Sequence, residues 1–308
     1  MFNVSHKSNS LRYARAEGVL RAHRNTLRCV RENAIPKGDV MATARAAGIS
    51  AAKRTSDWIV FCHPIPLDWV EIKMQVLEEE FRVTAEVESV WKTGVEMEAL
   101  TAVTAALMNA YDMLKPLDND MEITGIKVIQ KKGGKSQFID DLKSPLKTAV
   151  LVISDSTYQG TRQDKSGQVI KNFLADYPID LAVNEILPDN KEMIQNRLLG
   201  LAKDGNFDLI LTTGGTGFGP RDLTPEATAP LLDKVAQGIV EKIRNYGSNL
   251  TPYAMLSRAV AGTIGNTLVI NLPGNPNSAR ESLHALFPGV LHIFPMIWGE
   301  GHKEADSS

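Results

Sequence analysis

The chain has 308 residues, of which 43% are hydrophobic and 23% are charged, as in an ordinary globular protein. A formal net charge of −2 excludes a strong general attraction to a polyanion, so we expect no nucleic-acid partner. No apolar run reaches the ~18 residues that span a bilayer, the N-terminus lacks the apolar part of a secretory signal, and the two cysteines make no disulfide framework. We therefore expect a cytoplasmic protein with room for two domains and no membrane partner.

The first half of the chain has the alternation of an antiparallel sheet. In residues 70–76 the apolar side chains of Val70, Ile72, Met74 and Val76 share one face, and Phe81, Val83, Ala85 and Val87 do the same in residues 81–87. The four residues between these strands suit a hairpin turn, and a long helix follows from about Gly94 to Leu114. These features predict an α+β domain with helices on one side of an antiparallel sheet.

The long helix has two different faces. At ~100° per residue, Leu100, Val103, Leu107, Tyr111 and Leu114 form a core stripe, and Glu98, Thr101, Ala105, Asp112 and Lys115 lie on the opposite side. Glu98 and Asp112 are 14 residues apart, which is ~21 Å along a helix axis. One small ligand cannot contact both, so we expect each end of the helix to serve a different site, with sites shared between subunits.

Several other side chains of the first half suit an anionic substrate. Lys37, Lys53 and Lys131 lie in or beside loops, and lysine can bind phosphate or transfer protons when its pKa is lowered, although each could also be solvated surface. Cys62 and His63 are adjacent, but no further Cys or His stands at a zinc ligand spacing. A core cysteine and a buried, hydrogen-bonded histidine are the ordinary alternative to a metal site.

The character of the chain changes near residue 145. Residues 137–147, "QFIDDLKSPLK", are mixed and polar, so we divide the chain into a domain at 1–138, a linker at 139–147 and a domain at 148–308. Beyond the linker, strands are expected at 148–154, 180–187, 207–213 and 267–272, and helices at 166–177 and 191–205. Two further helices are expected to begin at the caps Thr224 and Ser278. This alternation predicts a doubly wound, mostly parallel α/β sheet.

The ends of these four strands carry acids, glycines or amides, at the edge where doubly wound sheets bind ligands. They are Ser154 and Asp155, then Asp189, then Gly214, Gly215, Thr216 and Gly217, and finally Asn271, Pro273 and Gly274. Glycines let backbone N–H groups approach a phosphate, Arg221 can neutralise its charge, and Asp189 and Asp222 are oxygen ligands suited to Mg²⁺. Alternatively, the glycines make a tight turn, the two acids are turn residues, Arg221 pairs with Asp222 or Glu226, and 271–276 is only a rigid loop.

The motifs of the second half occur in a specific order: "SDS", "LPDN", "TTGGTGFGPRDLTPEA", "LSRAVAG" and "NLPGNP". From Thr148 onward the chain resembles the molybdopterin adenylyltransferase family. The resemblance implies that the terminal phosphate of the pterin attacks the α-phosphate of ATP, with Mg²⁺ required and pyrophosphate released. It makes Asp189 and Asp222 the acids tied to catalysis and Mg²⁺, with the "GGTG" loop cradling phosphates. Ser154, Asp155 and the "LPGNP" loop would line the pocket.

The first half also carries an ordered set: "VSHKSNSLRYARAEG", "KGDV", "ARAAGISAAKRT", "CHP", "TGVEMEALTA", "YDMLK" and "KKGGKS". Residues 2–136 resemble the cyclic pyranopterin monophosphate synthase family. The resemblance implies a ferredoxin-like fold in a hexamer of dimers, with active sites at the dimer interface. The substrate would be 3′,8-cyclo-7,8-dihydro-GTP, which rearranges to the pyranopterin with loss of pyrophosphate.

Residue roles follow from that second resemblance. Asp112 is the expected catalytic acid/base, and Lys37, Lys115 and Lys131 are proton-transfer or phosphate groups. The substrate pocket is expected to include Lys53, Phe61, Cys62, His63, Glu96, Met97 and Glu98. The chain departs from the family pattern at Asn3, where an acid is usual, at "FCHPIP" and at Gln137.

We interpret the chain as a fusion of two enzymes, and we expect a hexamer because hexamer and trimer symmetries are compatible. In the alternative, one or both halves bind a pterin as a scaffold without turnover, or the second half is a general nucleotide-binding domain. The presence of Asp112, Lys131, Asp189 and Asp222 favours catalysis.

Overall fold

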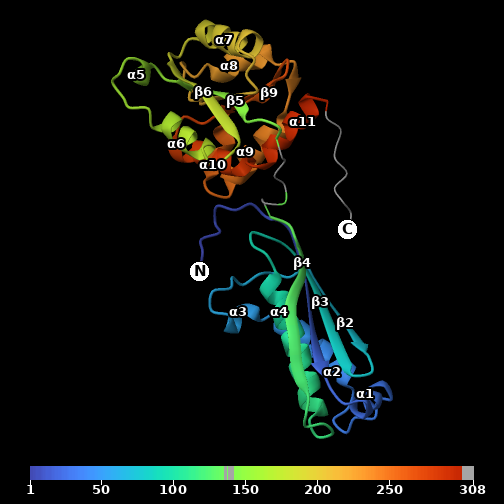
Figure 1. Ribbon diagram of the computed structural model, residues 1–308. Helices are drawn as coiled ribbons and strands as arrows, with labels where there is room; N and C mark the ends of the chain where they lie inside the picture. The colour runs from blue at the N-terminus through green and yellow to red at the C-terminus, as the bar shows by residue number, and fades with distance from the viewer. Residues whose placement is uncertain (135–136, 138–141, 300–308) are drawn as a thin grey trace. The chain divides into compact units, whose positions relative to one another are not determined.

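The computed structural model describes residues 1–134, 137 and 142–299. The chain forms two compact units, Met1–Gln137 and Phe138–Ser308, and each has its own sheet and core (Figure 1). Residues 139–141 of the predicted linker lie outside the described residues, and its last two residues, Leu146 and Lys147, belong to the first strand of the second unit. Among the helices described, none is both long and apolar enough to cross a bilayer.

The first unit has a four-stranded antiparallel sheet in the order β2-β3-β1-β4. Its strands are β1 (Ser10–Arg21), β2 (Trp69–Val76), β3 (Glu80–Trp91) and β4 (Glu122–Lys132). Its helices are α1 (Arg24–Arg31), α2 (Val40–Ala52), α3 (Thr55–Trp58) and α4 (Glu96–Leu114). The predicted antiparallel sheet with helices is confirmed.

The core of the first unit lies between the sheet and α4, which also packs on α2. The predicted inward residues of β3 are fully buried, namely Phe81, Val83, Ala85 and Val87. In β2, an edge strand, only Ile72 of the predicted inward set is buried. A Cβ at Gly48 of α2 would lie 2.9 Å from the carbonyl oxygen of Ala102, so this glycine permits the close contact of α2 with α4.

The second unit has a six-stranded sheet in the order β6-β5-β7-β10-β9-β8. Its strands are β5 (Leu146–Ile153), β6 (Ile179–Leu187), β7 (Leu209–Thr213), β8 (Lys234–Val235), β9 (Ala261–Ile264) and β10 (Thr267–Leu272). The first four in spatial order are parallel, and β9 and β8 extend the sheet by antiparallel pairing. The predicted doubly wound, mostly parallel sheet is confirmed.

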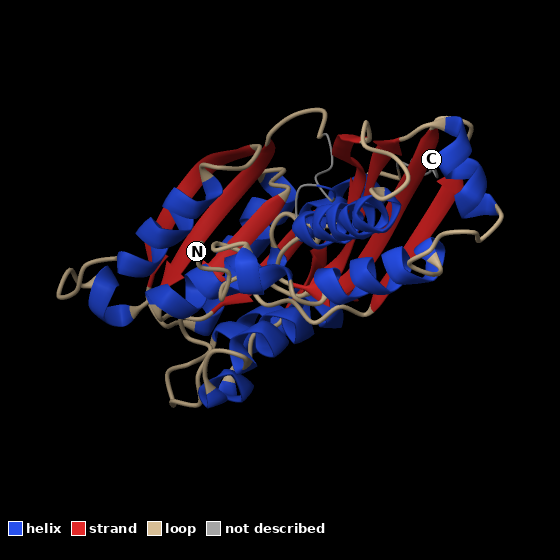
Figure 2. Ribbon diagram, turned by 90° about the horizontal axis from the view of Figure 1, so that it is seen from below, coloured by secondary structure: helices blue, strands red, loops and turns tan. Residues whose placement is uncertain are grey.

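Helices cover both faces of this sheet, as Figures 1 and 2 show. They are α5 (Asp155–Tyr158), α6 (Lys165–Leu174), α7 (Lys191–Leu199), α8 (Thr224–Thr228), α9 (Gln237–Ser248), α10 (Pro276–Leu286) and α11 (Ile293–Ile297). Short helical turns lie at Gly200–Asp204, Ala229–Leu231, Pro252–Leu256 and Gly289–His292. Successive residues of β5 point to opposite faces: Val150 and Val152 face α6, α9 and α10, and Leu151 faces α7 and α8.

The structure corrects both predicted helix caps of the second unit. The N-cap of α8 is Leu223, and the hydroxyl of Thr224 instead donates to the carbonyl oxygen of Gly214 at 2.8 Å. The helix α10 begins at Pro276, and its cap is Asn275, whose side chain accepts from the N–H groups of Asn277 and Ser278. Proline at the first helical position favours this earlier start.

Candidate active sites

The C-terminal end of α4 carries an acid between two lysines. Lys115 Nζ lies 2.6 Å from Asp112 Oδ1, and Lys37 Nζ lies 2.8 Å from Asp112 Oδ2. The hydrogen bonds from Lys115 and then Lys37 lower the pKa of Asp112 to about 2. The structure thus brings together Asp112, Lys37 and Lys115, and it holds the carboxylate in its charged form.

The N-terminal end of α4 carries a buried acid. Glu98 is 3% exposed, and burial, with the nearby carboxylate of Glu96 as a smaller cause, raises its pKa to about 7. Burial, followed by the charge of Glu98, raises the pKa of the Cys62 thiol, which favours the unreactive protonated form. Lys131 Nζ lies 3.7 Å from Glu96 Oε1, so Lys131 belongs to this end of α4.

The other predicted pocket residues of the first unit are more accessible. His63 Nε2 lies 3.0 Å from the carbonyl oxygen of Phe2, and the imidazole is only half-buried, so it is no core histidine. Phe61 is 76% exposed and Met97 is 38% exposed. Lys53 is exposed at the C-terminus of α2.

The two ends of α4 therefore form separate clusters within one chain. Asp112, Lys37 and Lys115 lie at one end, and Glu96, Glu98, Cys62 and Lys131 are grouped at the other. The structure does not bring Lys131 to the other two lysines. A substrate that needs both clusters can reach them only if a second copy of the chain supplies one of them.

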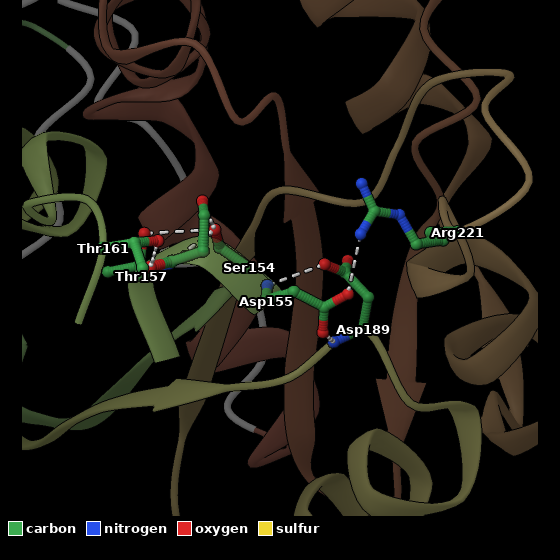
Figure 3. Close-up of polar contacts among 7 residues, drawn as sticks. Ser154, Asp155, Thr157, Thr161, Asp189 and Arg221 are labelled. Carbon is green, nitrogen blue, oxygen red and sulfur yellow. Dashed lines mark hydrogen bonds and ion pairs between the residues drawn. The ribbon is translucent and has the colours of Figure 1, made fainter. Parts of the chain in front are cut away.

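In the second unit, Asp155 and Asp189, which follow the adjacent strands β5 and β6, are joined by two hydrogen bonds (Figure 3). The N–H of Asp155 donates to Asp189 Oδ2 at 2.9 Å, and the N–H of Asp189 donates to Asp155 Oδ1 at 3.0 Å. Arg221 Nη1 lies 3.3 Å from Asp155 Oδ2, so among the described residues it pairs with this acid and not with Asp222 or Glu226, as the sequence alternative had it. Ser154 caps the short α5 by accepting from the N–H of Thr157 at 3.3 Å.

The glycine loop after β7 presents backbone donors. Gly214 and Gly215 have φ values of +103° and +61°, which L side chains rarely adopt. Among the hydrogen bonds of the described residues, none uses the N–H groups of Gly215, Thr216, Gly217 or Phe218. These four successive N–H groups are therefore free to bind an anion, as backbone N–H groups of turns do in phosphate sites.

Asp222 lies close under this loop. Its Oδ2 accepts from the N–H of Gly219 at 2.7 Å, and a Cβ added at Gly217 would lie 2.9 Å from the same oxygen. Burial raises the pKa of Asp189, and the charges of Asp155 and Asp222 raise it further. Three carboxylates whose charges act on one another indicate a place where a cation would be favourable.

These acids fit Mg²⁺ only as a partial ligand set. Within residues 1–134 and 142–299, no group of three or more His, Cys, Asp or Glu side chains is placed to hold a metal. Asp189 and Asp222 could supply two hard oxygen ligands, with water and substrate phosphates completing the coordination, which is the usual arrangement for Mg²⁺.

The loop after β10 supports the glycine loop. The Pro273 carbonyl oxygen accepts from the Thr213 hydroxyl at 2.7 Å, and a Cβ on Gly274 would lie 3.0 Å from the Cα of Gly214. Asn271 is fully buried, and its amide donates to the hydroxyls of Thr212 and Thr228. Asn271 thus connects β7 to α8 through buried hydrogen bonds and does not line the site.

A cavity of about 270 Å³ adjoins the loops, and its lining includes Thr216, Gly217 and Pro273 as well as the apolar side chains of Tyr246 and Leu256. Sequence reasoning missed this cavity and also Arg258, which contacts the backbone of the glycine loop. The only sequence signal for Arg258 is the motif "LSRAVAG", which assigns no role to its arginine.

Taken together, these features define a two-part protein, in which a unit with clusters of lysines and acids is joined to a doubly wound unit with a glycine loop and acids at its strand ends. Residues 1–134 match the MoaC family, and residues 149–292 match the family described as "Probable molybdopterin binding domain". Over 302 residues the chain is 39% identical to the molybdenum cofactor biosynthesis bifunctional protein of Chlorobaculum tepidum, which covers 98% of this chain and 96% of the relative. The chain therefore belongs to the family of molybdenum cofactor biosynthesis bifunctional proteins, which confirms the resemblances seen in the motifs.

Two further relatives cover one part of the chain each. The cyclic pyranopterin monophosphate synthase of Heliobacterium modesticaldum is 49% identical over 140 residues, 44% of this chain and 87% of the relative. The solved structure of the molybdopterin biosynthesis enzyme MoaB of Thermus thermophilus is 45% identical, covers 50% of this chain and 97% of its own, and has a TM-score of 0.48.

Proposed function

We propose that the chain catalyses two separate steps of molybdenum cofactor biosynthesis. The first unit converts 3′,8-cyclo-7,8-dihydro-GTP to cyclic pyranopterin monophosphate with release of pyrophosphate. The second unit adenylylates molybdopterin with Mg–ATP. Family membership supports the pathway, and the observation that carries the second activity is the row of four unused N–H groups beside Asp189 and Asp222.

In the first unit, the lysines bind the triphosphate of the substrate and the acids move protons. Glu98, with a pKa near neutrality, can both donate and accept a proton at neutral pH, so we add it to Asp112 as an acid/base candidate. Lys37 and Lys115 hold Asp112 as an anion in the absence of substrate. A bound triphosphate would compete for both ammonium groups and return the pKa of Asp112 toward its ordinary range.

The assembly of the first unit follows from the two clusters on α4. We place the active site between two copies, with the Glu98 end of one and the Asp112 end of the other, and we retain the hexamer as the expected assembly. The order β2-β3-β1-β4, with helices between β1 and β2 and between β3 and β4, supports the ferredoxin-like assignment.

In the second unit, an oxygen of the terminal phosphate of molybdopterin attacks the α-phosphorus of ATP. The new P–O bond forms as the bond to the β-phosphate oxygen breaks, and pyrophosphate leaves. The loop N–H groups and Arg221 stabilise the charge on the phosphates, and positioning of this kind is most of what phosphoryl transfer requires. Mg²⁺, when held by Asp189 and Asp222, would neutralise further phosphate charge.

The second activity is tested by pyrophosphate release from Mg–ATP in the presence of molybdopterin. The wild-type chain should release pyrophosphate only when molybdopterin is added, and Asp222→Asn should reduce the rate on the order of 100-fold, as expected for loss of charge stabilisation. Arg197→Gln is a matched control, since it removes the surface pair with Glu185 and should leave the rate unchanged.

Two results would contradict the assignment. Equal release by the wild-type chain and Asp222→Asn would show that the acid has no part in the reaction. Binding of molybdopterin without any pyrophosphate release would favour the scaffold alternative. An ATP affinity that does not change when molybdopterin is added would favour a general nucleotide-binding domain.

A further inference from the structure

Arg258 lies between the helical turn Pro252–Leu256 and β9, and its side chain is 25% exposed. Its Nε donates to the carbonyl oxygen of Gly217 at 2.6 Å, and its Nη2 donates to the carbonyl oxygen of Asp222 at 2.7 Å. Its backbone N–H donates to the carbonyl oxygen of Thr216 at 3.2 Å. One residue therefore binds two carbonyl groups of the glycine loop and the carbonyl group of Asp222.

The guanidinium group is itself held in place. Its Nη1 pairs with Glu226 Oε1 on α8, and its Cζ lies 5.3 Å from the centre of the Phe218 ring. The planar guanidinium offers five N–H donors in a fixed arrangement, so it can bind carbonyl and carboxylate groups in several directions at once. Arg258 thus connects the glycine loop to the helix that follows it.

The contacts of Arg258 with the two loop carbonyl groups fix the orientation of the peptide groups that follow Thr216 and Gly217. In a trans peptide the C=O and the N–H point in opposite directions. With the carbonyl groups of Thr216 and Gly217 turned toward Arg258, the N–H groups of Gly217 and Phe218 are turned away from it, and both are among the unused donors of the loop. If these peptides flipped, carbonyl oxygens would face the phosphate and repel it.

We propose that Arg258 is a positioning residue for the adenylylation reaction. It does not contact the substrate. It binds the carbonyl groups of the phosphate loop, so that the loop presents only N–H groups to the phosphates, and it fixes the backbone of Asp222 beside them. This inference rests on the proposed function of the second unit, and it assigns a role to the arginine of "LSRAVAG".

The kinetic test compares the full-length wild-type chain with Arg258→Lys, Arg258→Gln and the control Arg197→Gln, using pyrophosphate release from Mg–ATP and molybdopterin. Loss of a positioning contact can cost about 100-fold in rate, so we expect kcat of Arg258→Gln to fall by about that factor, with a smaller change in the KM for ATP. A lysine has no planar fork and can replace only part of the contacts, so Arg258→Lys should recover part of kcat. Arg197→Gln should behave as the wild type, although it also loses an arginine–glutamate pair.

A second measurement needs no turnover. Backbone hydrogen exchange of residues 214–222 should be faster in Arg258→Gln than in the wild type, and inorganic pyrophosphate should slow it in the wild type but not in the variant. Unchanged kcat, or unchanged exchange of the loop, would overturn the role of Arg258. If the wild-type chain released no pyrophosphate, the proposed function would fail, and the exchange measurement would still decide whether Arg258 orders the loop.

Discussion

At the scale of single residues, Glu98 is the most unusual side chain of the first unit, because a carboxyl group that is 3% exposed must be desolvated to carry its charge. Its pKa is about 7 in the folded chain against an ordinary 4.5. Between these values the folded state keeps a proton that the unfolded state has lost, so wild-type stability should fall as pH rises from about 4.5 to about 7 and level off above.

Glu98→Gln should remove this fall. Its free energy of unfolding, compared with that of the wild type, should rise with pH across that window by on the order of 2–3 kcal/mol. Chemical denaturation of both chains at a series of pH values measures the difference. Glu32→Gln, an exposed change at the C-cap of α1, is the control and should show no such trend. Parallel stability curves for Glu98→Gln and the wild type would show that Glu98 is not held protonated.

Gly214 is a residue whose conformation and surroundings both exclude a side chain. Its φ is +103°, and a Cβ there would collide with the carbonyl oxygen of Ile153. Gly214→Ala should therefore displace the phosphate loop and abolish adenylylation. Gly160 is the matched control, because its φ of +75° carries the same kind of strain but open space surrounds it. Gly160→Ala should cost about 1–2 kcal/mol of stability and leave pyrophosphate release intact. Equal activity of the two variants would contradict this account.

At the scale of elements, α4 is a rigid spacer that separates Glu98 from Asp112. If each active site lies between two copies of the chain, Glu98→Gln and Asp112→Asn damage different halves of the same site. A mixed dimer then has one intact site and one doubly altered site. Equal mixing of the two inactive variants, after dissociation and reassembly, should restore about a quarter of wild-type conversion of the cyclic nucleotide, since half of the dimers are mixed.

The control for this experiment is a mixture of Asp112→Asn with Lys37→Gln. Both residues lie in the same cluster, so no mixed dimer regains an intact site and no recovery is expected. Recovery in the control, or its absence in the first mixture, would show that the site is not divided between the two ends of α4.

Several elements could be predicted from the sequence because burial and periodicity agree in them. The strand β10 follows the predicted 267–272, and β3 buries the predicted Phe81, Val83, Ala85 and Val87. The strands β1, β4, β8 and β9 were not predicted. The two and four residues of β8 and β9 are too short to show alternation, β1 buries small side chains such as Ala14 and Ala16, and β4 has no buried residue. The cap of α10 was misplaced because both Asn275 and Ser278 offer a capping side chain, and only the packed structure decides which one is used. The cap of α8 was misplaced because the hydroxyl of Thr224 donates to the carbonyl oxygen of Gly214 and does not cap the helix.

At the scale of the whole molecule, the sequence placed polar residues at one edge of the parallel sheet, because the carboxyl ends of parallel strands meet there. It could not show which side chains face the edge. Asn271 follows the pattern but is buried in the core, whereas Arg258 lies in an irregular segment and reaches the loop through three-dimensional packing alone. Likewise, the sequence analysis assigned Lys37, Lys115 and Lys131 a common role because they are all lysines, and the fold places Lys131 at the other end of α4 from Lys37.

The two units have separate sheets and separate cores, so a substitution in one active site should not change the activity of the other. Asp112 is exposed at the end of α4, and Asp112→Asn removes a charge without disturbing packing. It should lower conversion of the cyclic nucleotide on the order of 100-fold, as expected for loss of a general acid/base, and leave adenylylation of molybdopterin within about 2-fold. Asp222→Asn should show the opposite pattern, and the double variant should combine the two losses, because sites that share no core or contact partners act independently. Both reactions would be followed with the same full-length preparations. Loss of both activities in either single variant would mean that the units depend on each other for catalysis, and it would contradict a chain built from two independent enzymes.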